Sequence, residues 1–339
     1  RERLCGMNRS ILVLCVLTFV TQASAEVVNV AEQVIVPGKD VTLEVNRLIA
    51  SLEGRSEITL FFPKGQYDFH PENAMEAHRA VTNHDNSLKR MAMPLFGFEV
   101  KAGQLLFGHY DWQDPFGQNT TFDSTTGAPI WNTKEYSLRV RPNTVATRVG
   151  ENRVRLQNAT KMPPPAGAAM ATYGQAPTNR LAQAIHVADS SNTVIEIVTV
   201  YAAGGMTLIA ERSENIHLNG FVVTSTAERY IATRADATHF LGCKGLIHLE
   251  NCRLEHMLDD GINVHGAYIK VVEYRGDNTF LCEISHRQQY GLTFAETGDR
   301  VMITLRETVL PLFETAVEDV EVINERRLLI RVAELPGKL

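Results

Sequence analysis

The sequence has few cysteines, and this scarcity narrows the class of protein. Five cysteines occur among 339 residues, and only Cys243, Cys252 and Cys282 lie beyond residue 25. Three is an odd number, so these residues form no complete disulfide framework. Cys243 and Cys252 flank one expected strand, and they either pair in an oxidising compartment or remain buried thiols. No Cys-x-x-Cys motif or His-rich spacing indicates a metal site, and we expect neither a metal nor another cofactor.

A large excess of charge of one sign is also absent. The formal net charge is −6, from 33 basic and 39 acidic residues, and no basic stripe or tail is present. Nucleic acid is therefore not an expected partner. Hydrophobic residues make up 44% of the chain and charged residues 21%, which is typical of a globular protein with a sizeable core. A mildly acidic surface suits a neutral substrate better than a polyanion.

Long apolar runs are missing as well. The most apolar stretch, Ile11 to Val20, is too short to cross a bilayer. A basic start at Met7-Asn8-Arg9 precedes it and Ala23-Ser24-Ala25 follows it, as in a cleavable secretory signal. We predict that residues 1–25 comprise upstream residues and a signal peptide, and that the protein is exported to the periplasm, cell surface or medium. A buried N-terminal strand is the alternative reading.

Two β-rich stretches repeat at an interval of 23 residues. Residues 190–200 (SSNTVIEIVTV) align with residues 213–223 (SENIHLNGFVV), which places Asn192 over Asn215. The apolar positions of a third copy are Ile247, Leu249, Cys252 and Leu254. Such a period indicates stacked supersecondary units, and the missing Leu-x-x-Leu-x-Leu spacing favours a parallel β-helix over a leucine-rich repeat. Chance similarity of two β-rich stretches is the alternative.

The flanking segments predict an all-β chain. Ile58 to Phe69 reads as strand, tight turn and strand, and it resembles the entry coil of pectate-lyase-like right-handed β-helices; a simple hairpin is the alternative. We expect the β-helix to span 26–265, with a β-rich insertion around 111–175. Short strands over 266–339 predict an incomplete β-barrel-like domain. Because no capping rung follows, we expect a C-terminally truncated sequence.

Three aspartates supply candidate chemistry. Asp236 lies in an interval that is eight residues longer than the repeat, and extra residues in a rung commonly form a loop on the binding face. Asp259 follows 23 residues later, so we expect these two on neighbouring rungs, one above the other. Asp260 shares a cleft with Asp259 only at a turn, which Gly261 permits. Glycoside hydrolysis typically uses two carboxyl groups, whereas a solvated turn is the alternative for Asp-Asp-Gly alone.

Nearby polar residues are candidates for binding a sugar. They are His239, Asn263, His265, Glu211 and Arg212. A single histidine is more often structural, and Glu211 with Arg212 fits a surface ion pair equally well.

Four segments resemble signature segments of glycoside hydrolase family 110. They are residues 200–206 (VYAAGGM), 209–216 (IAERSENI), 235–240 (ADATHF) and 257–266 (MLDDGINVHG). The resemblance implies a right-handed parallel β-helix with β-barrel insertions and an exo-acting α-1,3-galactosidase that inverts configuration without a metal. It also implies that Asp236, Asp259 and Asp260 are the catalytic carboxylates. Gly261 stands where we expect a larger residue such as alanine.

Two other functions stay open. A β-helical polysaccharide lyase uses a basic residue and usually a carboxylate-bound cation, but no Arg or Lys lies between Asp259 and Gly266. A non-catalytic glycan-binding solenoid binds without the aspartates. The expected partner is a galactose-terminated oligosaccharide or polysaccharide, and a homo-oligomer is an option by analogy with other β-helices. Inversion predicts roughly 6.5–9.5 Å between the acid and base carboxyl groups.

Overall fold

The computed structural model describes residues 26–70, 73, 78–79, 91–92, 119–136, 142–151, 153–158, 161–172, 183–227 and 229–336. The predicted signal segment, 1–25, lies outside these ranges. Most of the described elements are strands. The described helices are α1 (Thr42–Ser51) and the 3₁₀ helices Val30–Gln33, Thr133–Tyr136 and Arg287–Gln289. Among the described residues, no helix has the length and apolarity needed to cross a membrane.

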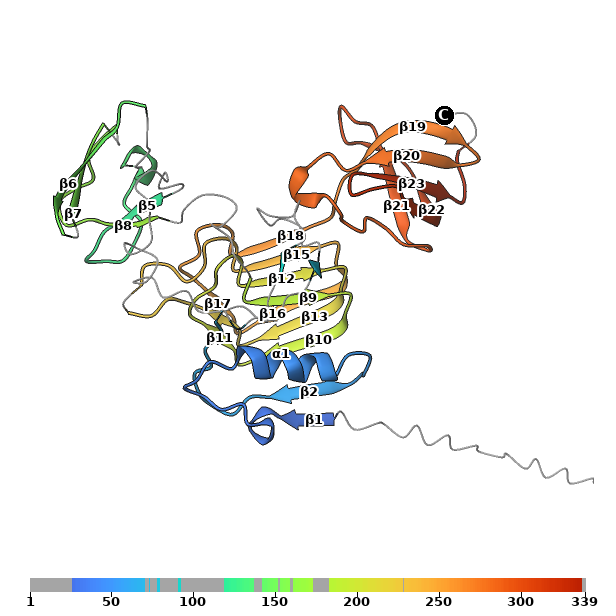
Figure 1. Cartoon of the computed structure of the whole chain (residues 1–339). Helices are drawn as coiled ribbons and strands as arrows, with labels where there is room; N and C mark the ends of the chain where they lie inside the picture. Colours follow the sequence, from blue (N-terminus) through green and yellow to red (C-terminus); the bar gives the residue numbers. More distant parts are fainter. Residues whose placement is uncertain are drawn as a thin grey trace, which may run out of the picture.

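The central region, residues 184–265, winds through three parallel sheets, and we call it the coil. The first sheet has the order β18-β15-β12-β9, with β9 (Ile185–Ala188), β12 (Leu208–Glu211), β15 (Thr238–Leu241) and β18 (Ile262–His265). The second contains β10 (Ser191–Glu196), β13 (Glu214–Asn219) and β16 (Lys244–Glu250), and the third contains β11 (Thr199–Val200), β14 (Val222–Val223) and β17 (Arg253–Leu254). Consecutive strands enter the three sheets in turn, so each circuit forms a rung against the next (Figure 1).

The predicted repeat sets the register of the second sheet. Ser191 pairs with Glu214 in parallel, an offset of 23 residues, and the Asn215 side-chain amide donates to Asn192 Oδ1 at 3.1 Å. The third copy also occupies its predicted positions. Its register pairs are Ile216 with Ile247, Leu218 with Leu249 and Val223 with Leu254. The alternation of apolar and polar residues therefore predicted which residues stack.

The core of the coil consists of the inward side chains of all three sheets. Phe221 and Phe240 are fully buried with Leu208 and Leu218, and Cys243 and Cys252 pack against this cluster. Burial of each large apolar side chain contributes about 1.5–3 kcal/mol. Cys243, Cys252 and Cys282 are all free thiols, so the first two do not pair with each other.

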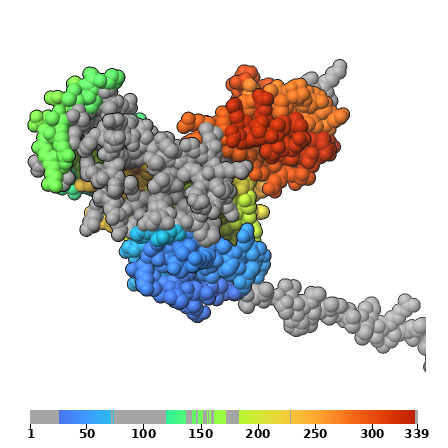
Figure 2. Space-filling model, in the orientation of Figure 1, coloured from blue at the N-terminus to red at the C-terminus, as the bar shows by residue number. Residues whose placement is uncertain are grey.

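An N-terminal unit, which contains β1, α1 and β2, lies at one end of the coil (Figure 1). Its residues form the blue part of the surface in Figure 2. β1 (Glu26–Asn29) pairs in parallel with β2 (Ile58–Phe61), and α1 packs through Val45. The predicted second strand near Phe69 is wrong, because this segment forms only an isolated bridge between Asp68 and Asp40. The chain after β2 turns back, and the Tyr67 hydroxyl donates to the Pro63 carbonyl at 2.7 Å.

The remaining described strands are antiparallel. A five-stranded sheet has the order β19-β20-β23-β22-β21 and lies at the opposite end of the coil from α1 (Figure 1). Its strands are β19 (Lys270–Gly276), β20 (Thr279–Glu283), β21 (Arg300–Thr304), β22 (Pro311–Val322) and β23 (Arg327–Val332). Smaller pairs are β3 (His78–Arg79) with β4 (Met91–Ala92), β5 (Asn119–Phe122) with β8 (Ala169–Thr172), and β6 (Val145–Gly150) with β7 (Arg153–Gln157).

Candidate functional site

The three aspartates meet just before the strands β15 and β18 of the first sheet. Thr238 pairs with Ile262, an offset of 24 residues, and the Ala237 N–H donates to the Asp260 carbonyl at 2.9 Å. The residue in register with Asp236 is therefore Asp260. The predicted stacking on Asp259 is wrong by one residue, because this circuit is one residue longer than the circuit between β10 and β13.

A bend brings the neighbouring aspartates into one cluster. Residues 258–261 lie between the Met257 bridge and β18, outside the strict alternation of a strand. One carboxylate oxygen from each of Asp236, Asp259 and Asp260 lies within 4.8 Å of the other two. Asp236 is only 3% exposed, whereas Asp259 and Asp260 are exposed. The cluster thus combines one buried carboxyl group with two that solvent reaches.

Gly261 does not adopt the left-handed backbone conformation that a glycine in a turn suggests. Its φ lies outside the left-handed region, and a Cβ at this position would meet only Met257 Cε, at 3.5 Å. That is an ordinary van der Waals distance, so alanine fits here. The bend at Asp259 and Asp260 therefore does not depend on glycine.

A chain of hydrogen bonds links Asp236 to two histidines. Asp236 Oδ2 lies 2.6 Å from His239 Nδ1, His239 Nε2 lies 3.0 Å from His265 Nε2, and His265 Nδ1 donates to the Gly266 carbonyl at 2.7 Å. The Gly266 carbonyl can only accept, so His265 carries a hydrogen on Nδ1. The other two contacts couple Asp236 and both imidazoles through shared hydrogens.

Asn263 completes the cluster on its exposed side. Its side-chain amide donates to Asp260 Oδ2 at 3.1 Å, and it pairs in register with His239 on the neighbouring strand. The structure therefore brings together the three aspartates and the predicted residues His239, Asn263 and His265. An amide donor on Asp260 fixes the direction in which that carboxylate faces.

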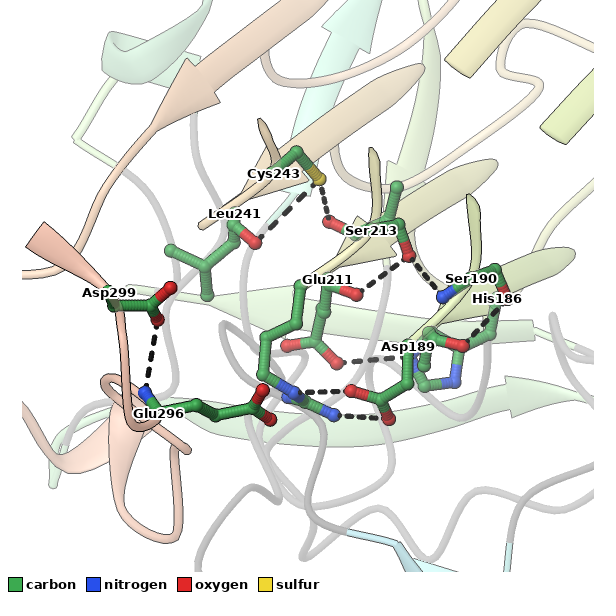
Figure 3. A network of polar contacts seen from close by, with 12 residues as sticks. His186, Asp189, Ser190, Glu211, Ser213, Leu241, Cys243, Glu296 and Asp299 are labelled. Atoms are coloured by element: carbon green, nitrogen blue, oxygen red, sulfur yellow. Dashed lines mark hydrogen bonds and ion pairs between the residues drawn. The ribbon is translucent and has the colours of Figure 1, made fainter. Parts of the chain in front are cut away.

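Glu211 and Arg212 have other partners. Glu211 is fully buried at the end of β12, and its Oε2 lies 3.0 Å from His186 Nε2 (Figure 3). Arg212 has a φ of 47°, and its guanidinium binds Asp189 through two hydrogen bonds of 2.7 and 2.8 Å. That hydrogen bonding to Asp189 raises the pKa of Arg212. The alternative of a surface ion pair between Glu211 and Arg212 is wrong.

Two further polar residues belong to this face of the coil. His186 on β9 is in register with Ile209, whose other neighbour in register is His239. Arg234, two residues before Asp236, is only 8% exposed. Sequence reasoning missed both residues. Arg234 could have been found as a charged residue within a stretch of small and apolar residues. His186 could have been found because the next residue, Val187, faces the core, so that His186 points to the opposite side of the strand.

Two groups of side chains among the described residues have the spacing of metal ligands. One is the aspartate cluster, and the other contains His217, His248 and Glu250 on the second sheet. A set made only of carboxylates suits Ca²⁺ or Mg²⁺, although exposed acidic groups are common without an ion. The second group has the nitrogen-rich donor set of a transition-metal site.

Two segments match known family models. Residues 79–170 match GLAA-B beta-barrel domain I, and residues 279–339 match GLAA-B beta-barrel domain II. The first match begins before the predicted insertion at 111, and the second falls inside the predicted barrel-like region. With the strands described above, the chain is a mostly β protein with barrel domains.

The chain is similar to curated proteins that are named alpha-1,3-galactosidases. The chain is 28% identical over 330 residues to alpha-1,3-galactosidase B of Parabacteroides distasonis, covering 76% of this chain and 53% of the relative. It is 34% identical over 204 residues to alpha-1,3-galactosidase B of Bacteroides fragilis, covering 58% and 33%. It is 28% identical over 255 residues to alpha-1,3-galactosidase A of Shewanella woodyi, covering 74% and 40%. The chain spans about half or less of these relatives.

Proposed function

We propose that this chain belongs to glycoside hydrolase family 110 and that it removes terminal α-1,3-linked galactose from glycans. The observation that supports this most is the meeting of Asp236, Asp259 and Asp260 within 4.8 Å. Glycoside hydrolysis typically uses one carboxyl group to protonate the leaving oxygen and another to activate water or attack the sugar. We further propose that the coil is a right-handed parallel β-helix that presents these residues.

In the proposed reaction, Asp236 is the acid. In this proposal Asp236 carries the proton, His239 and His265 hold the carboxyl group in place, and the proton passes to the leaving glycosidic oxygen. Asp260, aligned by Asn263, or its neighbour Asp259, takes a proton from the attacking water. The histidines position Asp236 and redistribute its proton, so they act through it rather than on the sugar.

Inversion requires that water attack opposite the leaving group. The nearest oxygens of the aspartates, within 4.8 Å, lie closer than the roughly 6.5–9.5 Å separation of carboxyl groups in inverting enzymes and near the about 5–5.5 Å of retaining ones. Carboxyl centres lie farther apart than their nearest oxygens. We keep inversion as the proposal because family resemblance implies it, and product stereochemistry separates the two mechanisms.

The carboxylate cluster favours one second candidate. Three aspartates that can hold a cation would also suit a polysaccharide lyase, in which the cation binds an acidic substrate. A cation-dependent lyase loses activity in EDTA, regains it with Ca²⁺, and forms an unsaturated product that is detected by its ultraviolet absorbance. The proposed galactosidase keeps its activity in EDTA and forms no such product.

The test is galactose release from digalactosides of different linkage. We expect release from the α-1,3-linked disaccharide and little from the α-1,4- or α-1,6-linked ones. In the variant Asp236→Asn/Asp259→Asn/Asp260→Asn, release stops while the circular dichroism spectrum is unchanged. Binding of a galactose-terminated glycan with no release from the folded wild-type chain would support a glycan-binding solenoid instead.

Export is part of the proposal, and it rests on the signal-like segment Met7 to Ala25. Expression of the full chain in a Gram-negative host should give a processed protein that begins at Glu26 and fractionates outside the cytoplasm. Intact-mass spectrometry measures this. An unprocessed chain in the cytoplasm would contradict export without affecting the proposed activity.

A further inference from the structure

A histidine and carboxylate cluster lies on the outward face of the second sheet, away from the aspartates on the first. His217 on β13 pairs in register with His248 on β16, although the two are 31 residues apart in sequence. Glu250 follows His248 by two positions, so both side chains leave the strand on the same face. The alternate residues Ile216, Leu218 and Leu249 pack in the core. The fold therefore brings three ligand-type side chains from two adjacent rungs to one spot.

The distances bring the three side chains close to the spacing of a metal site, and a turn of the His248 ring completes it. His217 Nε2 lies 3.0 Å from Glu250 Oε1, and the rings of His217 and His248 stack at 4.5 Å with an interplanar angle of 8°. One ligand atom from each of the three residues lies within 4.8 Å of the others. Ligand atoms about 2.0–2.2 Å from a tetrahedral zinc ion lie roughly 3.3–3.5 Å apart. The His217–Glu250 pair is already this close.

We propose that His217, His248 and Glu250 bind a divalent transition metal, with Zn²⁺ as the best match. Two imidazoles and one carboxylate form a ligand set that zinc proteins use, and the fourth position is left to water. Imidazole nitrogen favours Zn²⁺, Cu²⁺ or Ni²⁺ over Ca²⁺ and Mg²⁺, which prefer oxygen ligands. The exposed ring of His248 has room to turn out of the stack toward the ion.

Neighbouring side chains on β10, β13 and β16 support the arrangement. Asn219 is in register with Glu250, and its amide lies 3.5 Å from Glu196 Oε1. The Asn251 amide donates to Asn219 Oδ1 at 3.1 Å. This row of side-chain hydrogen bonds crosses the same strands beside the cluster.

A metal at this position would join two rungs of the coil. His217 belongs to one circuit and both His248 and Glu250 belong to the next, so the ion adds a cross-link between rungs that backbone bonds, core packing and the His217–Glu250 contact already join. Because the three ligands meet only in the folded chain, binding stabilises the folded state. We expect Zn²⁺ to raise the melting temperature of the protein.

Isothermal titration calorimetry with Zn²⁺ alone tests the proposal on the full chain. The wild-type protein should bind one equivalent that the double variant His217→Ala/His248→Ala lacks. The variant Glu250→Gln keeps both imidazoles and should bind at least about tenfold more weakly. The matched control is His286→Ala, which removes an exposed histidine far along the chain and should leave the titration unchanged.

A second pair of variants excludes the other candidate ligands. Zn²⁺ binding should persist in Asp259→Asn/Asp260→Asn and in Cys243→Ala/Cys252→Ala, and the rise in melting temperature should vanish only in the histidine variants. If the wild type binds no Zn²⁺, or if binding survives the double histidine variant and is lost with the aspartates or thiols, the proposal is wrong. Circular dichroism confirms that each variant is folded.

Discussion

Two histidine–glutamate pairs stand on different faces of the same coil and differ mainly in burial. His186 lies 3.0 Å from Glu211 on the first sheet, and His217 lies 3.0 Å from Glu250 on the second. The side chains of the first pair are 11% and 0% exposed, and those of the second are 32% and 42% exposed. The same two groups at the same distance thus sit in different dielectric surroundings.

The comparison shows that burial, rather than distance, separates the two faces. A buried carboxylate that loses its partner carries the full desolvation penalty, whereas water replaces the partner of an exposed one. On the first sheet, Asp236 and His239 are each 3% exposed and hold their geometry without competition from water. On the second sheet, the exposed cluster is open to an ion from solution.

The largest effect should come from the aspartates beside the first sheet. Asp236→Asn and Asp260→Asn should each lower kcat for an α-1,3-linked galactoside about 10²–10⁴-fold, because a positioned acid or base contributes that much. The matched control is Asp319→Asn, which changes an exposed carboxylate on β22 and should leave kcat unchanged. Steady-state galactose release measures both. Near wild-type kcat in either site variant would remove that aspartate from the mechanism.

A second contrast lies within one sheet, between its core side and its outward side. Leu218→Ala removes a fully buried side chain and should lower the free energy of unfolding by about 2–5 kcal/mol. Val194→Ala, on β10, changes a side chain that is 57% exposed, and its effect should stay within about 0.5 kcal/mol. Urea denaturation compares the two. Equal losses would mean that the second sheet is covered on both sides.

The two histidine–glutamate pairs provide the sharpest contrast. Glu211→Gln should lower the free energy of unfolding by about 1–3 kcal/mol, because it weakens the partner of a buried group. Glu250→Gln should lower it by less than about 1 kcal/mol in metal-free buffer. Thermal melts with and without EDTA measure the difference. If Glu250→Gln in EDTA lost more free energy of unfolding than Glu211→Gln, the greater importance of the buried pair would be contradicted.

A smaller effect concerns Cys282, in the core of the antiparallel sheet. Burial raises the pKa of its thiol from 9.0 to about 11. A group with a raised folded pKa contributes stability that is present below the unfolded value and is lost as pH rises through the folded one. Between about pH 9 and 11, wild-type stability should fall more steeply than that of Cys282→Ala, by up to about 1.4 kcal/mol per pH unit. Parallel slopes in denaturation titrations would contradict the burial of this thiol.

The register of the repeating strands was predictable from the sequence, whereas the lengths of the turns between the strands were not. The 23-residue alignment placed Asn192 against Asn215 because alternating apolar residues must share one core. The offset of 24 between Asp236 and Asp260 arises in a bend, where no periodic pattern marks the length. The pairing of Glu211 with His186 depends on which sheet face is covered, and that is a tertiary property. The segment near Tyr67 failed as a strand because it forms only an isolated bridge, between Asp68 and Asp40.

Proton NMR of an α-1,3-linked digalactoside during hydrolysis shows directly whether the aspartates release galactose and with which configuration. We predict that β-galactose appears first and later mutarotates, which would establish the linkage, the hydrolysis and the inverting use of the aspartates together. Early α-galactose would contradict inversion and agree with the short spacing of the nearest carboxylate oxygens. In that case one of the aspartates is a nucleophile.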